Sequence, residues 1–380
     1  MAPRSAAAKL AKRNKNKKTA APPKRSDAPQ QQEAAEVSAK IPLELQQLLL
    51  NVFRNAFPSR FGSDLKSLLQ EVKQHLYHRD FLTAFGKAEY LEAYAVRWSP
   101  SRALGYLQIF NDLEQHFLAI EEAGSRETGK PWKVVCLGGG AGAEIVGLAG
   151  LLKQLVKKDV PSESIQDERP SEESSDTAMS APALPQFEIS AIDIANWTPV
   201  VTSLHSAITT APTLSQYASA AAKASNVELL PPHLFKTTSV QQDILTMSTD
   251  DLSDQLHNAD LITLMFTLNE LYSTSLAKTQ AFLMRLTASL QQGSLLLVVD
   301  SPGSYSTVTL NGAEKQYPMH WLLDHTLLSV PKDAKSTGEG PKWGKIHSDE
   351  SRWFRLPEGL KYPIDLENMR YQIHLYERLP

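Results

Sequence analysis

The sequence has a single cysteine, Cys136, and no long run of apolar residues within its 380 residues. One cysteine can form neither a disulfide within the chain nor a cluster of thiolate ligands for zinc. No segment approaches the roughly 18 consecutive apolar residues that a membrane-spanning helix requires, and no apolar stretch follows the basic N-terminus as it would in a secretory signal. We therefore expect an intracellular protein in a reducing compartment, without a membrane span or a metal site.

Positive charge is concentrated at the N-terminus. Residues 1–28 hold nine Lys or Arg and one acid, although the net charge of the whole chain is −3. Residues 1–40 contain almost no large apolar side chains, so they cannot bury enough surface to offset the entropy lost on ordering. The pattern predicts a disordered basic tail over 1–40. Three interpretations of this tail are compatible with one another: a solvated segment, a nuclear or nucleolar address, and a non-specific phosphate binder.

The segment after the tail has the apolar spacing of helices. Periodic runs occupy Leu43–Phe53, Leu65–Leu76 and Tyr90–Ala95. Pro100 lies near a helix start expected at Ser99, and this helix is expected to continue to Gly124. We predict a helical cap over residues 41–125.

From Trp132 onward, short apolar runs alternate with amphipathic segments. The apolar runs are Lys133–Leu137, Phe187–Asp193, Leu261–Phe266 and Ser294–Asp300. Buried parallel strands have such continuous apolar runs, and their alternation with helices predicts an α/β fold with a doubly wound sheet over 126–380. Arg370–Arg378 alternates like an edge or antiparallel strand. A Ser-, Glu- and Pro-rich stretch at about 158–185 predicts a disordered acidic insert. The Lys- and Gly-rich composition of Lys332–Lys345, with Trp343, predicts a mobile loop that contacts RNA or a plain linker.

A glycine-rich turn, Gly138-Gly-Gly-Ala-Gly142, joins the first predicted strand to a helix. Glycines permit positive φ angles and close approach of a ligand to the backbone, and a helix N-terminus offers free N–H groups. We predict that Gly138, Gly139, Gly140 and Gly142 bind a nucleotide-like cofactor; the alternative is a tight turn without a ligand. The same residues also fit the dinucleotide fingerprint, so the motif alone leaves nicotinamide and S-adenosylmethionine open.

Three features further along the chain favour S-adenosylmethionine. Asp193 ends the second strand, where an acid can bind a ribose diol. Asp243 and Ile244 follow another predicted strand, at the point where methyltransferases commonly meet the adenine amino group. The fourth strand ends in polar groups of the kind that lie beside the sulfonium in methyltransferases. The polar residues predicted to bind the cofactor there are Thr267 and Asn269. The chain has no Tyr-x-x-x-Lys pair for hydride transfer, which disfavours a nicotinamide dehydrogenase.

Five segments together resemble a more specific family. They are Arg97–Tyr106, Cys136–Glu144, Thr267–Leu271, Val299–Ser304 and Pro318–Asp324. These segments are similar to those of the fungal large-subunit (25S) ribosomal RNA uridine N3-methyltransferases, within the class I S-adenosylmethionine-dependent methyltransferases. The resemblance covers about residues 45–380. It implies a Rossmann-like seven-stranded sheet, methyl transfer to a uridine ring nitrogen of ribosomal RNA, and a location in the nucleus and nucleolus.

One position departs from the class I pattern. Many of these enzymes have an acid two residues before the first glycine of the turn, and here that position is Cys136. We interpret Cys136 as a buried small apolar residue and not as a nucleophile. The task of orienting the turn or the methionine amine would then fall to a backbone carbonyl or to Glu144.

The segment after the fourth strand also supplies the predicted catalytic residues, Asn269 and Glu270. A uridine imide nitrogen is protonated at neutral pH, so methylation requires removal of that proton. Glu270 could take it or orient the base; alternatively it is a helix-start residue stabilised by the helix dipole. Asn269 could hold a uracil carbonyl or the cofactor amine.

Arginines and aromatic residues in two segments predict substrate binding, since guanidinium groups bind phosphate and aromatic rings stack on bases. The predicted substrate-binding residues are Arg97, Trp98, Arg102 and Tyr106 in the helical cap, and Tyr305 and His320 after the fifth strand. The alternative for the aromatic residues and His320 is a packing role.

Two other kinds of function stay open from the sequence. The first is a methyltransferase that acts on protein or a small molecule, against which the basic tail and the arginine-rich cap argue. The second is a catalytically inactive methyltransferase fold that serves as a binding subunit, against which the intact glycine turn, Asp193 and Asn269 argue. We expect a monomer whose partner is ribosomal RNA or the pre-ribosome.

Overall fold

The structure is a computed structural model that describes residues 41–122, 129–159, 184–303, 305–310, 313–330 and 340–380. The predicted basic tail lies outside the described residues, as does nearly all of the predicted acidic insert. None of the helices in these ranges is long and apolar enough to cross a bilayer.

A seven-stranded sheet with the strand order β3-β2-β1-β4-β5-β9-β8 organises the fold. Its strands are β1 (Trp132–Leu137), β2 (Phe187–Asp193), β3 (Phe235–Gln241), β4 (Leu261–Met265), β5 (Leu295–Asp300), β8 (Trp343–Phe354) and β9 (Met369–Arg378). Strands β1 to β5 run parallel, whereas β9 is antiparallel to both β5 and β8. A separate hairpin consists of β6 (Tyr305–Leu310) and β7 (Ala313–Pro318). The prediction of a doubly wound α/β sheet is confirmed, and so is the antiparallel strand at the end of the chain.

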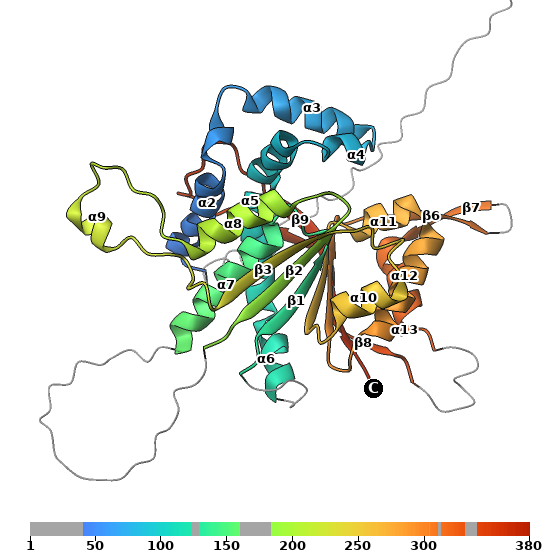
Figure 1. The fold of residues 1–380 in the computed structure, drawn as a ribbon. Helices are drawn as coiled ribbons and strands as arrows, with labels where there is room; N and C mark the ends of the chain where they lie inside the picture. Colours follow the sequence, from blue (N-terminus) through green and yellow to red (C-terminus); the bar gives the residue numbers. More distant parts are fainter. Residues whose placement is uncertain (1–40, 123–128, 160–183, 304, 311–312, 331–339) are drawn as a thin grey trace, which may run out of the picture. The chain divides into compact units, whose positions relative to one another are not determined.

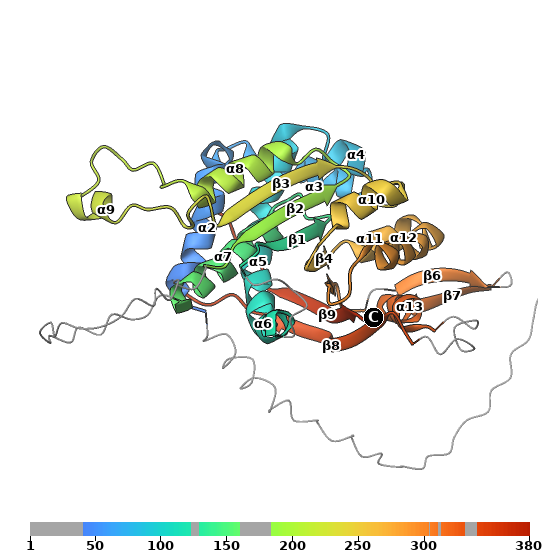
Figure 2. The same cartoon turned by 60° about the horizontal axis from the view of Figure 1, so that its bottom comes forward.

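Helices cover both faces of the sheet (Figures 1 and 2). They are α2 (Leu43–Ala56), α3 (Leu65–Tyr77), α4 (Phe81–Ala84), α5 (Ala88–Asp112), α6 (Glu114–Glu122), α7 (Ala143–Asp159), α8 (Thr198–Thr209), α9 (Ala220–Ala224), α10 (Thr249–Leu256), α11 (Leu268–Thr274), α12 (Leu276–Ser289) and α13 (Met319–Leu328), with a 3₁₀ turn, η1, at Pro58–Phe61.

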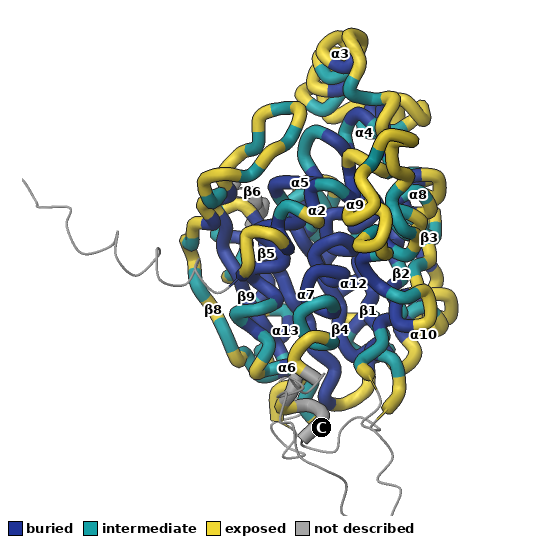
Figure 3. Tube along the Cα trace, turned by 90° about the vertical axis from the view of Figure 1, so that its left-hand side faces the viewer, coloured by how far each residue is buried: buried dark blue, intermediate teal, exposed yellow. Residues whose placement is uncertain are grey.

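The two faces of the sheet carry separate hydrophobic clusters. Successive side chains of a strand point to opposite faces. Accordingly, Val134 and Cys136 of β1 join α2, α5, α7 and α8 in one cluster, while Val135 and Leu137 join α10, α12 and α13 in the other. Figure 3 shows the buried strands and α7 between more exposed outer segments such as α3. The fold is therefore a three-layer α/β/α arrangement.

The N-terminal helices share the core of the sheet. Leu49 and Phe53 of α2 and Phe110 of α5 are fully buried, and they belong to the same cluster as Val134 of β1. The segment predicted as a helical cap thus contains α2 to α6, and its apolar faces pack onto the helices and strands of the sheet.

The expected helix start at Ser99 is wrong, because α5 continues through Pro100 without a break. Proline lacks the N–H that would bond to the carbonyl of Val96, four residues earlier, and an unsatisfied carbonyl normally disfavours such a helix. Here the Tyr362 hydroxyl donates to the Val96 carbonyl at 2.9 Å. A residue that follows Val96 by 266 positions therefore satisfies the group that Pro100 leaves free.

The loop predicted over Lys332–Lys345 is also partly wrong. Trp343–Lys345 begin the long strand β8, and Trp343 is buried, with its indole N–H donating to the Thr287 hydroxyl. Residues 331–339 of that stretch lie outside the described residues.

Candidate active site

A cavity of about 560 Å³ lies at the carboxyl ends of the parallel strands. The strand order reverses between β1 and β4, and doubly wound sheets bind ligands at such a switch point. The walls come from the glycine turn after β1, the ends of β2 and β4, and residues of α3 to α5. The volume lies within the range of about 300–1,000 Å³ that is usual for small-molecule sites.

The glycine turn forms one wall of this cavity. Gly138, Gly139 and Gly142 line it, and Gly138 and Gly142 have φ angles of +80° and +82°. A Cβ atom on Gly138 would lie 2.4 Å from the Thr267 hydroxyl oxygen. Gly140 does not line the cavity, and its N–H donates to Asp193 Oδ2 at 3.2 Å. Only glycine fits this turn, and the resulting bare backbone can approach a nucleotide-like ligand closely.

Asp193, at the end of β2, lines the cavity next to the glycine turn. Its Oδ2 accepts the Gly140 N–H and its Oδ1 accepts the Ala195 N–H, each at 3.2 Å. Burial raises the pKa of Asp193, and these two N–H groups act in the opposite direction. Each carboxylate oxygen has a second lone pair, so an ionised Asp193 can also accept hydrogen bonds from a pair of hydroxyl groups.

Asp243 and Ile244 line the cavity after β3. The Asp243 carboxylate accepts the Leu245 N–H at 2.9 Å and the Thr246 hydroxyl at 3.1 Å, so it holds its own loop in place. Ile244 is buried, whereas Ile194 in the same cavity is 52% exposed. These isoleucines give the cavity apolar surface that suits a flat heteroaromatic ring.

A buried carboxyl group lies beside the glycine turn although β1 lacks an acid. Cys136 is fully buried, and burial raises the pKa of its thiol well above the usual value, so the thiol is neutral. Glu144, at the start of α7, lines the cavity and accepts the Thr263 hydroxyl at 2.7 Å. Burial raises the pKa of Glu144 to about 7. The helix thus supplies the acid that the strand does not carry.

The end of β4 brings the predicted catalytic segment to the same cavity. Thr267 and Glu270 line it, but Asn269 lines neither of the two cavities described here. Instead, the Asn269 backbone N–H donates to Asp300 Oδ2 at 3.0 Å. Asp300, at the end of β5, is buried and also accepts the Ser301 N–H at 2.7 Å.

Asp300 is a site residue to which the sequence assigned no role. Burial raises its pKa to about 6, while the N–H groups of Asn269 and Ser301 lower it. Its position as an acid ending an apolar strand, within the Val299–Ser304 segment, is the pattern that could have identified it. The hydrogen bond from Asn269 fixes the start of α11 relative to β5.

Phe266 precedes this segment in an unusual backbone conformation. Its φ angle is +57°, in the left-handed region that bulky residues rarely adopt. Such conformations are strained by about 1–3 kcal/mol and concentrate at functional sites. The Phe266 ring lies 6.5 Å from that of Tyr106 and 5.1 Å from the Arg102 guanidinium.

Helix α5 contributes Arg102 and Tyr106 to the cavity. Tyr106 is buried, and Arg102 donates to the Tyr94 hydroxyl at 3.1 Å. Because a guanidinium is charged at all accessible pH values, Arg102 places a permanent positive charge on this wall, on the same side as Phe266.

A second cavity of about 190 Å³ meets the first at Arg102 and Phe266, which line both. Arg97 and Trp98 line this smaller cavity, together with residues at the start of β9. Arg97 is held by an ion pair with Glu367. The structure thus places the four predicted substrate residues of α5 along two adjoining cavities.

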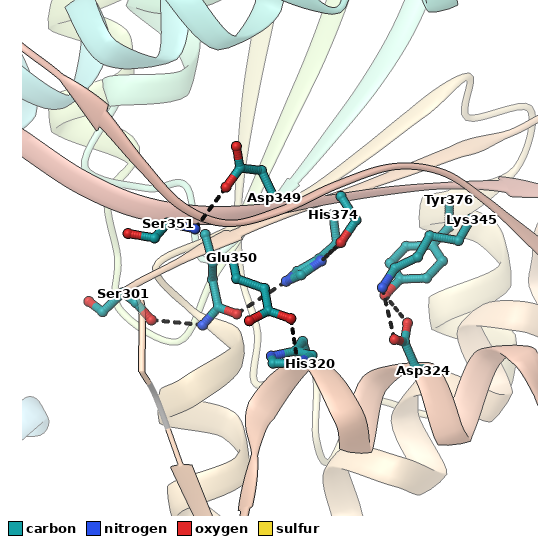
Figure 4. Close-up of polar contacts among 11 residues, drawn as sticks. Ser301, His320, Asp324, Lys345, Asp349, Glu350, Ser351, His374 and Tyr376 are labelled. Carbon is teal, nitrogen blue, oxygen red and sulfur yellow. Dashed lines mark hydrogen bonds and ion pairs between the residues drawn. The ribbon is translucent and has the colours of Figure 1, made fainter. Parts of the chain in front are cut away.

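The remaining two predicted substrate residues lie elsewhere. His320 on α13 lines neither cavity; its Nε2 is 3.5 Å from Glu350 Oε1, and its ring stacks on His374 at 5.5 Å (Figure 4). Tyr305 is the first residue of β6 and pairs with Pro318, and its side chain is not among those described. In the described ranges, no group of three or more His, Cys, Asp or Glu residues could hold a metal ion.

Comparisons with known proteins bear on this arrangement. Residues 53–377 match the family described as "Putative SAM-dependent methyltransferase". The chain is also 32% identical over 315 residues to the 25S rRNA (uridine(2843)-N(3))-methyltransferase of Saccharomyces cerevisiae, which covers 83% of this chain and 78% of the yeast protein.

Solved structures give weaker likenesses. Human N-acetylserotonin methyltransferase in complex with SAM aligns with a TM-score of 0.32 and 14% identity, covering 84% of this chain and 67% of the human chain. A SAM-dependent methyltransferase from Methanosarcina mazei aligns with a TM-score of 0.33 and 9% identity, covering 65% and 92% of the two chains.

Proposed function

The chain belongs to the family of S-adenosylmethionine-dependent methyltransferases, and we propose that it methylates N3 of a uridine in large-subunit ribosomal RNA. The observation that carries the proposal is the pair of adjoining cavities. The larger cavity is lined by the glycine turn, Asp193 and Glu270. The smaller cavity is lined by Arg97 and Trp98, and Arg102 lines both. The uridine of ribosomal RNA is proposed as substrate because the yeast relative is named as a 25S rRNA uridine N3-methyltransferase.

The residues of the larger cavity fit S-adenosylmethionine, which supplies a methyl group already activated by its sulfonium. Asp193 would accept hydrogen bonds from the ribose hydroxyls, and the apolar surface of Ile194 and Ile244 would hold the adenine. Glu144 would receive the methionine amine, since it is a second carboxyl group beside the glycine turn and Asp193 is assigned to the ribose. A side chain at position 138 would collide with Thr267, so this residue must be glycine. Its bare backbone then lets the ligand approach closely.

The chain's own residues would then handle the proton and the base. Glu270 lines the cavity near the end of β4, where its carboxylate can accept the imide proton of the uracil. Arg102 can donate to a uracil carbonyl oxygen and stabilise the negative charge that develops when the proton leaves. Alignment of the nitrogen with the methyl group accounts for the rest of the rate, since fixed geometry replaces a bimolecular encounter.

Methylation of ribosomal RNA in vitro tests the proposal directly. The purified protein would be incubated with S-adenosylmethionine and large-subunit ribosomal RNA from cells that lack this protein. We expect N3-methyluridine to appear in the digested nucleosides by mass spectrometry. The Asp193→Ala variant, which should not bind the cofactor well, is the matched control. Methylation of another base, or transfer only to protein or a small molecule, would refute the proposed substrate.

Location is a further part of the proposal. A substrate made in the nucleolus requires the enzyme to reach that compartment, and the nine basic residues within 1–28 are suited to serve as the address. We therefore propose a nuclear and nucleolar location that depends on residues 1–40.

A further inference from the structure

An exposed tryptophan with two arginines lies beside the smaller cavity. Trp353 of β8 is 48% exposed and pairs in register with Arg370 of β9. The guanidinium of Arg370 lies 5.7 Å from the centre of the Trp353 ring, and that of Arg355 lies 4.9 Å from it. We call these three residues the Trp353 face. None of them was predicted from the sequence to bind anything.

The Trp353 face adjoins the smaller cavity through Arg370. Arg370 lines the smaller cavity together with Trp98 of α5. That cavity in turn meets the larger one at Arg102 and Phe266. A chain lying on the Trp353 face would therefore be separated from the cavity that Glu270 lines only by the smaller cavity and its shared wall of Arg102 and Phe266.

The positive charge of this face is not compensated by its neighbours. Neither Arg355 nor Arg370 forms an ion pair with any residue that the structure describes. Arg370 instead donates from Nε and Nη2 to the Ser351 hydroxyl, at 3.1 and 2.9 Å, which fixes the guanidinium without neutralising it.

In the described ranges, no nearby acid forms an ion pair with these two arginines. Asp349 accepts the Ser351 N–H at 2.9 Å, and Glu350 turns toward His320 (Figure 4). Glu367 pairs with Arg97. A phosphate that approaches Arg355 and Arg370 therefore meets guanidinium groups that are not already in salt bridges.

We propose that the Trp353 face binds the single-stranded RNA that flanks the methylated uridine, with a base stacked on Trp353 and phosphates paired with Arg355 and Arg370. This inference rests on the proposed function and names a binding surface for it. Single-stranded RNA is recognised by bases that stack on aromatic rings and by guanidinium groups. The uncompensated charge favours RNA over an apolar protein partner, which would leave both arginines unpaired.

The test measures RNA affinity and cofactor affinity separately in the full-length protein. The RNA probe is a fluorescein-labelled single-stranded decauridylate, followed by fluorescence anisotropy across a salt series. Three variants are compared with the wild type: Trp353→Ala, Trp353→Phe, and the double variant Arg355→Ala with Arg370→Ala. Lys223→Ala, on the exposed helix α9 at the opposite edge of the sheet from β8, is the charge control (Figures 1 and 2).

We expect Trp353→Ala to weaken RNA binding about five- to a hundredfold, the usual effect of removing one stacked base, and Trp353→Phe to restore most of it. The double arginine variant should reduce the salt dependence of log Kd by about 0.7 for each phosphate that is no longer neutralised. S-adenosylmethionine affinity by calorimetry should stay unchanged, which also establishes that the variants fold. With ribosomal RNA as substrate, KM should rise more than kcat falls.

Three contrary outcomes are distinguishable. If the wild type binds and methylates ribosomal RNA but the variants bind RNA as tightly as Lys223→Ala, the Trp353 face is not the RNA surface and the proposed function stands. If the wild type neither binds nor methylates ribosomal RNA, the proposed function is wrong and the inference fails with it. Variants that keep RNA affinity but no longer associate with a protein would assign the face to a protein partner and overturn the inference.

Discussion

At the scale of single residues, Asp193 connects the glycine turn to the end of β2. Its carboxylate accepts two backbone N–H groups and lines the cavity. We expect Asp193→Ala to weaken S-adenosylmethionine binding about tenfold to a thousandfold, because a charged hydrogen bond contributes about 1.5–3 kcal/mol and a ribose diol forms two. Calorimetry measures the affinity directly. Unchanged affinity in a folded variant would remove Asp193 from the cofactor site.

Glu144 should make both stability and cofactor binding depend on pH. Its pKa is raised to about 7 in the folded protein, so its contribution to folding is complete below about pH 4.5 and is lost as pH rises toward 7. Between about pH 4.5 and 7 the wild type should therefore lose on the order of 3 kcal/mol of unfolding free energy that the Glu144→Gln variant keeps. Urea unfolding at several pH values measures it.

The same residue predicts how cofactor affinity changes with pH. A cationic methionine amine favours the ionised form of Glu144, so affinity should increase with pH up to about 7, where the amine is still protonated. The Gln variant should bind more weakly, and its affinity should vary less over this interval. Asp300, with a pKa of about 6, titrates in both proteins and therefore cancels in the comparison. Equal pH profiles would mean that Glu144 does not face the amine.

Glu270 is the residue whose role in the chemistry is most open to test. If its carboxylate takes the imide proton, Glu270→Gln should slow methyl transfer about a hundredfold to ten-thousandfold while cofactor affinity is retained. The effect should shrink as pH rises, because the uridine then ionises without a base. Single-turnover methylation across pH measures this. A small, pH-independent decrease would instead assign Glu270 to the helix start, where the dipole interaction contributes about 0.3–1 kcal/mol.

At the scale of elements, α5 depends on a hydrogen bond from the C-terminal part of the chain. The Tyr362 hydroxyl satisfies the Val96 carbonyl that Pro100 leaves without a donor. We expect Tyr362→Phe to lower the free energy of unfolding by about 1–3 kcal/mol, the penalty for an unsatisfied buried carbonyl. Combining it with Pro100→Ala should recover much of this stability, since alanine supplies the missing N–H. Urea denaturation of the two single variants and the double variant measures the coupling free energy between Tyr362 and Pro100. Strictly additive effects would exclude this coupling.

The helices and strands differ in how far the local sequence predicts them. The parallel strands β1, β2, β4 and β5 and the glycine turn were predictable, because these strands are largely apolar runs and the turn requires glycine locally. β8 was not, since most of its residues between Trp343 and Phe354 are polar or charged. The continuity of α5 through Pro100 depends on Tyr362, whose proximity only the tertiary structure supplies.

The residues of the candidate site likewise differ in how far the sequence predicts their positions. Asp193, Thr267 and the glycines lie at strand ends, and strand ends of a parallel sheet meet at one edge, so their convergence could be predicted. Glu144 could also be predicted, since it follows the glycine turn by two residues, whereas the positive φ of Phe266 has no pattern in its own sequence. The Trp353 face joins two antiparallel strands, one of which was not predicted.

At the scale of the whole molecule, the two halves of the sheet have different tasks in the proposed enzyme. The parallel strands β1 to β4 provide the residues assigned to the cofactor, whereas the antiparallel pair β8–β9 provides the Trp353 face. Helix α5 contributes to both cavities through Arg102. Cofactor affinity and RNA affinity should therefore be separable by mutation, as the variants at Asp193 and Trp353 would show.

The basic tail should be separable from both activities. Residues 1–40 have almost no large apolar side chains, and the cavity residues all lie between Leu76 and Arg370. Deletion of 1–40 should thus leave the unfolding midpoint and S-adenosylmethionine affinity unchanged. RNA affinity should fall together with its salt dependence, because each phosphate that the tail no longer neutralises reduces the slope of log affinity by about 0.7–0.9.

Nucleolar accumulation of a fluorescent fusion should also fall when residues 1–40 are deleted. A tail of the same composition in scrambled order restores the charges, and so separates RNA binding from nucleolar targeting. A scrambled tail that recovers RNA affinity but not location would assign the address to a specific motif, and a deletion that weakens cofactor binding would show that the tail belongs to the folded enzyme.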